Sequence, residues 1–178
     1  MNKIVLFILF FCITSSAQNF KCGFDVEFSW IRISDANGMG MLGVSQSPIS
    51  GHLNLGYNVN ESISVQIKIG RSIVTEFLGW EYGILGKYKL FKPLYISFGI
   101  LNHRNEGDIY SNQLAVSSPS ILMIQSGAGI DIVDFFSLGF DYYIPTIKQV
   151  IVWRGFGVRE PQTFEKMIRL GFNFGWEL

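Results

Sequence analysis

Apolar and polar residues alternate at period two through much of the chain. The closing segment RLGFNFGWEL is typical: Phe172, Phe174 and Trp176 fall on one face, and glycine or polar residues fall between them. This alternation indicates a β-strand whose two faces meet different environments. The pattern predicts eight strands, at residues 22–33, 51–59, 63–73, 79–91, 94–102, 120–133, 135–144 and in the closing stretch that ends at residue 178.

The connections between these strands alternate between long and short. Tight turns are predicted at 60–62, at 92–93 and at Asp134, whereas longer connections cover 34–48, about 72–78, 103–119 and 145–164. In an even-stranded barrel with both chain ends at one rim, short turns share that rim and long loops share the other. All five prolines fall in predicted connections, as expected because proline cannot donate a hydrogen bond within a sheet.

The N-terminus carries the pattern of an exported protein. Lys3 precedes an apolar run at 4–13, and the small residues Ser15 and Ala17 stand where a signal peptidase reads the chain. We therefore predict a secretory signal peptide at residues 1–17, with residues 18–178 as one barrel domain. The alternative is an N-terminal membrane anchor, which needs about 20 apolar residues.

Composition strengthens the membrane interpretation. Hydrophobic residues make up 48% of the chain, yet after Ala17 no apolar run approaches the roughly 18 residues of a transmembrane helix. The apolar residues are distributed at period two instead. The predicted fold is therefore all-β, an eight-stranded antiparallel up-and-down transmembrane β-barrel in the outer membrane of a Gram-negative bacterium. Acidic and basic residues balance at 14 each, which predicts no nucleic-acid partner, and Cys22 is the single cysteine after the predicted signal.

Alternation alone leaves open which face points outward. A lipocalin-like soluble barrel would turn its apolar face inward around a ligand. The uncharged apolar face and the small residues of the polar face favour a membrane barrel, whose narrow interior is filled by side chains. Aromatic residues also gather near the predicted strand ends, as at two membrane interfaces: Trp30, Trp80 and Tyr142 toward the long loops, and Tyr57, Tyr88, Phe136 and Trp176 toward the short turns.

The polar face carries charges that are predicted to line the lumen. They are Asp25, Glu27, Lys68, Glu81, Lys87, Lys89, Asp131, Asp141, Arg169 and Glu177. Because buried charges must be paired, we expect a network of salt bridges and hydrogen bonds, with His52 as a further member. The alternative is a path for protons or ions. No His, Cys and carboxylate cluster has metal-ligand spacing, so neither a metal, a cofactor nor a catalytic residue is predicted.

The closing strand resembles the C-terminal signal by which the barrel-assembly machinery recognises outer-membrane barrels. Gly171, Phe172, Phe174, Trp176 and Leu178 follow that pattern after Arg169, although Leu178 replaces the usual final phenylalanine. The chain from residue 18 onward resembles the small OmpX/OmpA-like barrels, and its AQ cleavage site is similar to those of Bacteroidetes outer-membrane proteins. The resemblance implies contact with the assembly machinery during biogenesis and with outer-membrane lipid and lipopolysaccharide afterwards.

A second, weaker resemblance concerns His103. The stretch LNHRNEGD is similar to the His-x-Ser-Asn stretch of outer-membrane lipid A deacylases, which are eight-stranded barrels with a serine hydrolase site on the lipid face. Asn105 stands here in place of the serine, so the nucleophile that such catalysis needs is missing from the motif. Ser111, Ser117 and Ser118 lie nearby in the sequence.

The last long loop is unusually apolar for a solvated connection. Val152, Trp153, Arg154 and Phe156 lie in its centre. We predict that the last two strands continue as a hairpin above the membrane, turning near residues 154–157. A protruding sheet edge of this kind is a candidate site for strand addition to a protein partner.

The predicted function is a non-enzymatic outer-membrane barrel with a structural or surface-interaction role through its extracellular loops. Two alternatives remain open at this point. One is a lipid-modifying enzyme that uses His103. The other is a narrow, porin-like pore or an accessory barrel of a secretion system.

Overall fold

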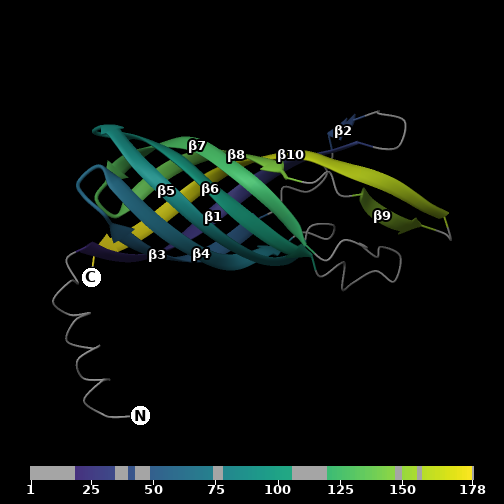
Figure 1. Ribbon diagram of the computed structural model, residues 1–178, viewed down its shortest axis with the longest axis horizontal. Helices are drawn as coiled ribbons and strands as arrows, with labels where there is room; N and C mark the ends of the chain where they lie inside the picture. The colour runs from purple at the N-terminus through teal and green to yellow at the C-terminus, as the bar shows by residue number, and fades with distance from the viewer. Residues whose placement is uncertain are drawn as a thin grey trace, which may run out of the picture.

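The computed structural model describes residues 19–34, 40–42, 49–73, 78–105, 120–146, 150–155 and 158–177. The described chain forms ten strands (Figure 1). They are β1 (Phe20–Ser34), β2 (Gly40–Leu42), β3 (Ile49–Asn58), β4 (Ile63–Ile73), β5 (Gly79–Phe91), β6 (Leu94–Asn105), β7 (Ile121–Val133), β8 (Phe136–Pro145), β9 (Val150–Gly155) and β10 (Val158–Glu177). No helix long and apolar enough to span a membrane occurs among the described residues.

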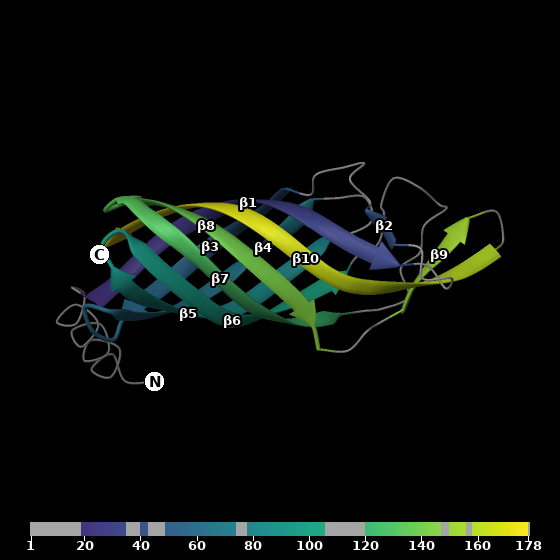
Figure 2. The same cartoon turned by 90° about the horizontal axis from the view of Figure 1, so that it is seen from above.

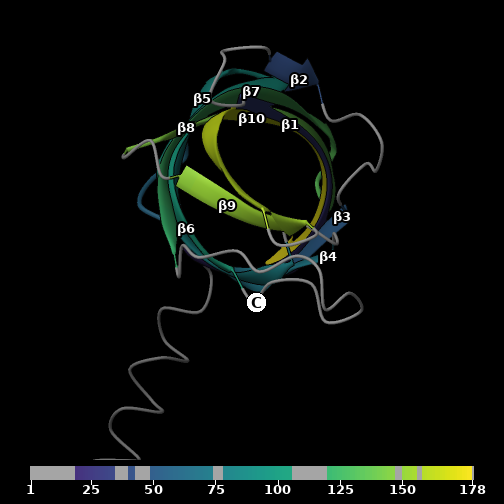
Figure 3. The ribbon, with the colours of Figure 1, turned by 90° about the vertical axis from the view of Figure 1, so that its right-hand side faces the viewer.

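Eight of the described strands close into an up-and-down barrel. The antiparallel pairing order around the ring is β1, β3, β4, β5, β6, β7, β8 and β10. Pairing of β1 with β10 closes the ring, which Figure 3 shows end-on. This closure sets Lys21 opposite Glu177, so the two ends of the barrel sequence lie at the rim of the short turns. The predicted fold class is confirmed.

The two faces of the barrel have the reverse of a soluble protein's polarity. Side chains on the outer face are apolar and exposed, as with Leu53 at 73% and Ile84 at 52% exposure. The intervening positions point inward and include Glu27 and Lys68, both almost fully buried. The lipocalin-like arrangement would need the opposite assignment of faces.

Beyond the barrel, β1 and β10 continue into a small four-stranded sheet in the order β2-β1-β10-β9. This sheet extension projects at the end of the long loops (Figure 2). The predicted hairpin is present, because β9 ends at Gly155 and β10 begins at Val158. The expectation that both closing barrel strands continue into it was wrong in one part: β8 ends at Pro145, and the separate strand β9 pairs with the early β10.

The prolines correct a second expectation. Pro93 occupies the tight turn between β5 and β6, but Pro145 is the last residue of β8 and Pro161 lies inside β10. Pro161 is opposite Val152 of β9, and the described pairing of β10 with β1 begins only at Thr163. At Pro161, β10 therefore has a described neighbour on one side only. The missing backbone N–H of proline is tolerated on the other side. Pro48 and Pro119 lie outside the described residues.

The interior is layered along the barrel axis. An apolar cluster fills the half toward the long loops; it consists of Leu101, Ile121, Met123, Tyr143, Phe164 and Met167, all fully buried. Charged side chains occupy the middle. A cavity of about 700 Å³ lies toward the short turns, and we call it the vestibule.

Candidate functional site

The middle of the lumen is organised around Glu81 of β5. Its carboxylate accepts two hydrogen bonds from Arg169 of β10, at 2.8 Å from Nη1 and 2.5 Å from Nη2. It also lies 2.7 Å from Nε2 of His52 on β3 and 3.0 Å from Nδ1 of His103 on β6. All four side chains are 97% or more buried. Four strands are thus joined at one carboxylate.

Glu27 of β1 forms the second centre. Arg169 donates from Nη1 to its Oε2 at 2.8 Å, and the Lys68 ammonium contacts its Oε1. Lys68 Nζ also lies 3.7 Å from Oδ2 of Asp25. The Asn173 amide, turned so that its nitrogen faces Asp25, donates to that carboxylate at 2.8 Å. Each buried cation of this lumen network therefore contacts two carboxylates, as buried charges require.

Strand register explains why these residues meet. His52, Gly70, Glu81 and His103 lie opposite one another in a row across β3, β4, β5 and β6. Gly70 is the gap in that row: a Cβ there would collide with the Gly51 carbonyl and with His52. Because position 70 has no side chain, His52 reaches across β4 to Glu81.

The structure does not bring all ten predicted lumen charges together. Asp25, Glu27, Lys68, Glu81 and Arg169 form the network described above. Asp141 lies opposite Arg169 on the neighbouring strand and accepts a hydrogen bond from Ser97 at 2.9 Å. The remaining predicted members line the vestibule instead: Lys87, Lys89, Asp131 and Glu177.

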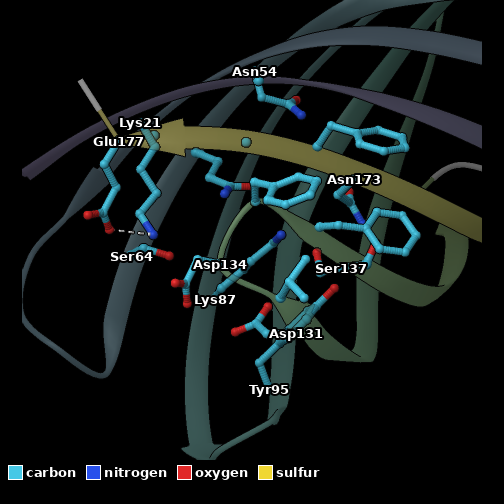
Figure 4. A pocket seen from close by; sticks show the side chains of 18 of the residues that line it. Lys21, Asn54, Ser64, Lys87, Tyr95, Asp131, Asp134, Ser137, Asn173 and Glu177 are labelled. Carbon is cyan, nitrogen blue, oxygen red and sulfur yellow. Dashed lines mark hydrogen bonds and ion pairs between the residues drawn. The ribbon is translucent and has the colours of Figure 1, made fainter.

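The vestibule has a polar wall and a mouth among the short turns. Lys87 places its ammonium 4.9 Å from the centre of the Tyr95 ring, and Asp131 lies on the same wall (Figure 4). At the rim, Glu177 pairs with Lys21 at 3.0 Å. Asp25 lines both the vestibule and the network, so the buried charges are reached from this side.

Two features of the lumen differ from the sequence-based expectation. His103 was expected at the long-loop rim, but β6 runs on to Asn105 and turns His103 inward, where it is fully buried. The apolar cluster was not foreseen, because the lumen face was expected to be polar throughout. Tyr143 links the two layers, since the Arg169 guanidinium lies 5.1 Å from its ring centre.

The predicted assembly-signal residues lie on the last part of β10. Phe172 packs edge-on against Phe28 at 5.9 Å between ring centres, and Phe174 stacks on Phe24 at 4.8 Å. Gly171 faces the lumen, Trp176 is 48% exposed, and Leu178 lies outside the described residues. These contacts seal the β1–β10 closure, while recognition by an assembly machinery stays a prediction.

The candidate loop-interaction residues lie at the far end of the sheet extension. Val152, Trp153 and Arg154 belong to β9, opposite Pro161, Glu160 and Arg159 of β10. Phe156 lies outside the described residues. In the described pairing order β9 is a terminal strand, so its outer edge carries no described partner.

No protein-family model matches the sequence, and no curated protein matches it. Solved structures resemble the fold, among them these three. Neisserial surface protein A matches at 14% identity over 89% of this chain and 97% of its own, with a TM-score of 0.50. The N-terminal barrel of Pseudomonas aeruginosa OprF matches at 15% identity over 85% and 97%, with a TM-score of 0.45. The Yersinia pestis attachment invasion locus protein Ail matches at 12% identity over 88% and 99%, with a TM-score of 0.41. At a TM-score of 0.50, the likeness to Neisserial surface protein A supports the same fold, a closed eight-stranded antiparallel barrel.

Proposed function

We propose that the chain is a non-enzymatic outer-membrane protein of a Gram-negative bacterium, with a structural or surface-interaction role. The inverted polarity of the barrel carries this proposal. Exposed apolar side chains cover the outside while Glu27, Glu81 and Arg169 are buried inside. A lipid-facing belt needs this arrangement, because a charge at the bilayer midplane costs about 2–4 kcal/mol for Arg or Lys.

Exposed aromatic rings support two membrane interfaces. Trp30 and Trp80 lie near the long-loop end of their strands and are 39% and 40% exposed. Tyr57, Tyr88 and Trp176 lie near the short-turn end and are 40%, 46% and 48% exposed. Aromatic residues are enriched at both interfaces of membrane barrels. The short turns would then face the periplasm and the sheet extension the cell exterior.

Further parts of the proposal rest on the sequence. Residues 1–17 would direct export, and the end of β10 would present the assembly signal. The apolar belt would contact outer-membrane lipid and lipopolysaccharide. The small OmpX/OmpA-like barrels of Bacteroidetes are the family to which these features point.

The alternatives find little support in the geometry. A deacylase-like enzyme would need its histidine at the lipid face, whereas His103 points inward and bonds Glu81. A pore would need an open lumen, whereas fully buried apolar side chains and the ion pairs of the lumen network occupy the described interior. The surface-interaction role is favoured by the sheet extension, because the outer edge of its terminal strand β9 pairs with no other described strand and is a candidate for strand addition.

The first experiment is gel migration of the protein from isolated outer membranes, with and without boiling. A folded membrane barrel stays compact in detergent and shifts on boiling, so we expect a heat-dependent shift in the membrane fraction. Recovery from the soluble periplasm without a shift would contradict the proposal.

A second experiment tests the surface role. Residues 150–158 are replaced by a short glycine-containing turn, and a matched deletion is made within residues 106–119. We expect only the first deletion to remove crosslinked partners on intact cells, while both proteins keep the heat-dependent shift. Unchanged crosslinking after the first deletion would exclude β9 as the contact.

A further inference from the structure

We propose that Asp25, Glu27 and His52 form a binding site for a divalent transition-metal ion inside the barrel. This goes beyond the proposed function, because it concerns the lumen and not the membrane location or the loops. One ligand atom from each of the three side chains lies within 4.8 Å of the others, and all three residues are buried.

The hydrogen bonding of His52 supplies an independent reason. Its Nε2 lies 2.7 Å from Oε2 of Glu81, a carboxylate that only accepts, so Nε2 carries a proton. Nδ1 of His52 is buried without a hydrogen-bond partner and lies 3.7 Å from Oε2 of Glu27. In the neutral ring Nδ1 therefore directs a lone pair at the carboxylates. A histidine held by a second carboxylate in this way is the usual arrangement of a metal ligand.

The donor atoms define the class of ion. One imidazole nitrogen and two carboxylates suit Zn²⁺ and related first-row divalent ions, and three protein ligands leave a position for water. Hard cations such as Mg²⁺ prefer oxygen ligands alone. Zn²⁺ is therefore the appropriate probe.

Charge balance favours a divalent ion. Among the described residues, the buried charged side chains comprise four carboxylates and two cations, which with neutral histidines gives a net charge of −2. The carboxylates are Asp25, Glu27, Glu81 and Asp141, and the cations are Lys68 and Arg169. Uncompensated buried charge is expensive. One divalent cation brings this interior to neutrality.

Lys68 competes with the ion and the vestibule admits it. The Lys68 ammonium contacts Glu27 and lies 3.7 Å from Asp25, so it already neutralises part of the negative charge of the proposed site.

Asp25 lines the vestibule, which gives the ion a hydrated route from the short-turn end. Binding would draw Glu27 and Asp25 toward His52 and displace the ammonium.

The test uses the complete tag-free protein refolded in detergent, with Cys12→Ser and Cys22→Ser to remove both thiols. ZnCl₂ is titrated calorimetrically, and zinc retained after desalting is measured by mass spectrometry. We expect one Zn²⁺ per chain. Absence of retained zinc in this protein would overturn the proposal.

Three variants locate the ion, each first checked for folding by its heat-dependent shift. His52→Gln should weaken binding at least about tenfold, and Asp25→Asn replaces it if that variant does not fold. His103→Gln is the matched control, since His103 also bonds Glu81 but is not in the donor set, and it should bind normally. Lys68→Met should bind at least about tenfold more tightly, because a nearby ammonium repels the ion in a dry site. Binding unchanged by the His52 or Asp25 substitution would identify adventitious zinc and overturn the site.

Discussion

Gly70 decides whether the lumen network can form. It occupies the one position of the His52–Glu81–His103 row that carries no side chain, and an added Cβ would meet the backbone of Gly51 and the His52 ring. Backbone cannot yield as a flexible side chain does. The smallest residue is therefore needed here for packing as much as for strand geometry.

Gly70→Ala is expected to lower the free energy of unfolding by about 1–3 kcal/mol, the usual cost of overpacking. Gly51→Ala is the matched control on the neighbouring strand, because a Cβ at Gly51 meets nothing within 4 Å. Urea unfolding of the refolded proteins measures both. Equal stability of the two variants would contradict the tight contact at Gly70.

Glu81→Gln should be among the most damaging single changes. It leaves Arg169 without its main counter-charge, and removal of one partner from a buried ion pair costs about 3–5 kcal/mol. Glu177→Gln breaks the exposed rim pair with Lys21, where a loss of about 0–1 kcal/mol is expected. The same unfolding assay compares them, and similar losses would show that the network does not stabilise the barrel.

At the scale of residues, the alternation of side chains along each strand predicts which charged residues face inward. It does not predict which of them contact one another. The His52–Glu81 contact joins residues on strands that are not neighbours, so it depends on the register of two strand pairs. Phe164 shows a second limit. A bulge at Glu165 shifts the β1–β10 register between Arg32 and Ile33, so Phe164 and Met167 both face inward despite their odd spacing.

Among the elements, strands bounded by tight turns were predicted best. The predicted ranges 63–73 and 79–91 agree with β4 and β5, because alternation is strict there and each strand adjoins a short turn. The short strand β2 was not predicted, and β9 was predicted only as a continuation of the preceding strand. Three to six residues carry too little alternation, and the pairing of both strands depends on the extended ends of β1 and β10.

The outer face of β5 provides a test of the membrane belt. Ile84 lies at mid-strand and Leu90 near the short turn, and both are exposed, at 52% and 50%. In lipid vesicles Ile84→Arg should cost about 2–4 kcal/mol, whereas Leu90→Arg should cost about 0–1 kcal/mol because it lies near the interface. Unfolding in vesicles gives both values. Equal costs would mean that β5 does not cross the bilayer with Ile84 at its centre.

Over the whole molecule, the lumen is asymmetric along its axis. The vestibule is open among the short turns, charges occupy the middle, and the apolar cluster fills the long-loop half. The fold class followed from alternation and loop lengths, but this asymmetry did not. Leu101 and Met123 are apolar residues at inward positions, where the alternation of apolar and polar residues predicts polar side chains. Only the closed barrel shows that they pack together.

The asymmetry predicts one-sided access to the lumen. In a background in which Cys12 and Cys22 are replaced by serine, Lys87→Cys places a thiol in the vestibule and Leu101→Cys places one in the apolar cluster. A charged methanethiosulfonate reagent should modify the first thiol, and only when the short-turn rim faces the reagent. The second should stay unmodified from either side, since Leu101 is fully buried. Mass spectrometry of barrels oriented in vesicles measures the modification. Labelling of the Leu101→Cys variant from the long-loop side would mean that the lumen is open at that end. That result would favour the pore as the function of this barrel.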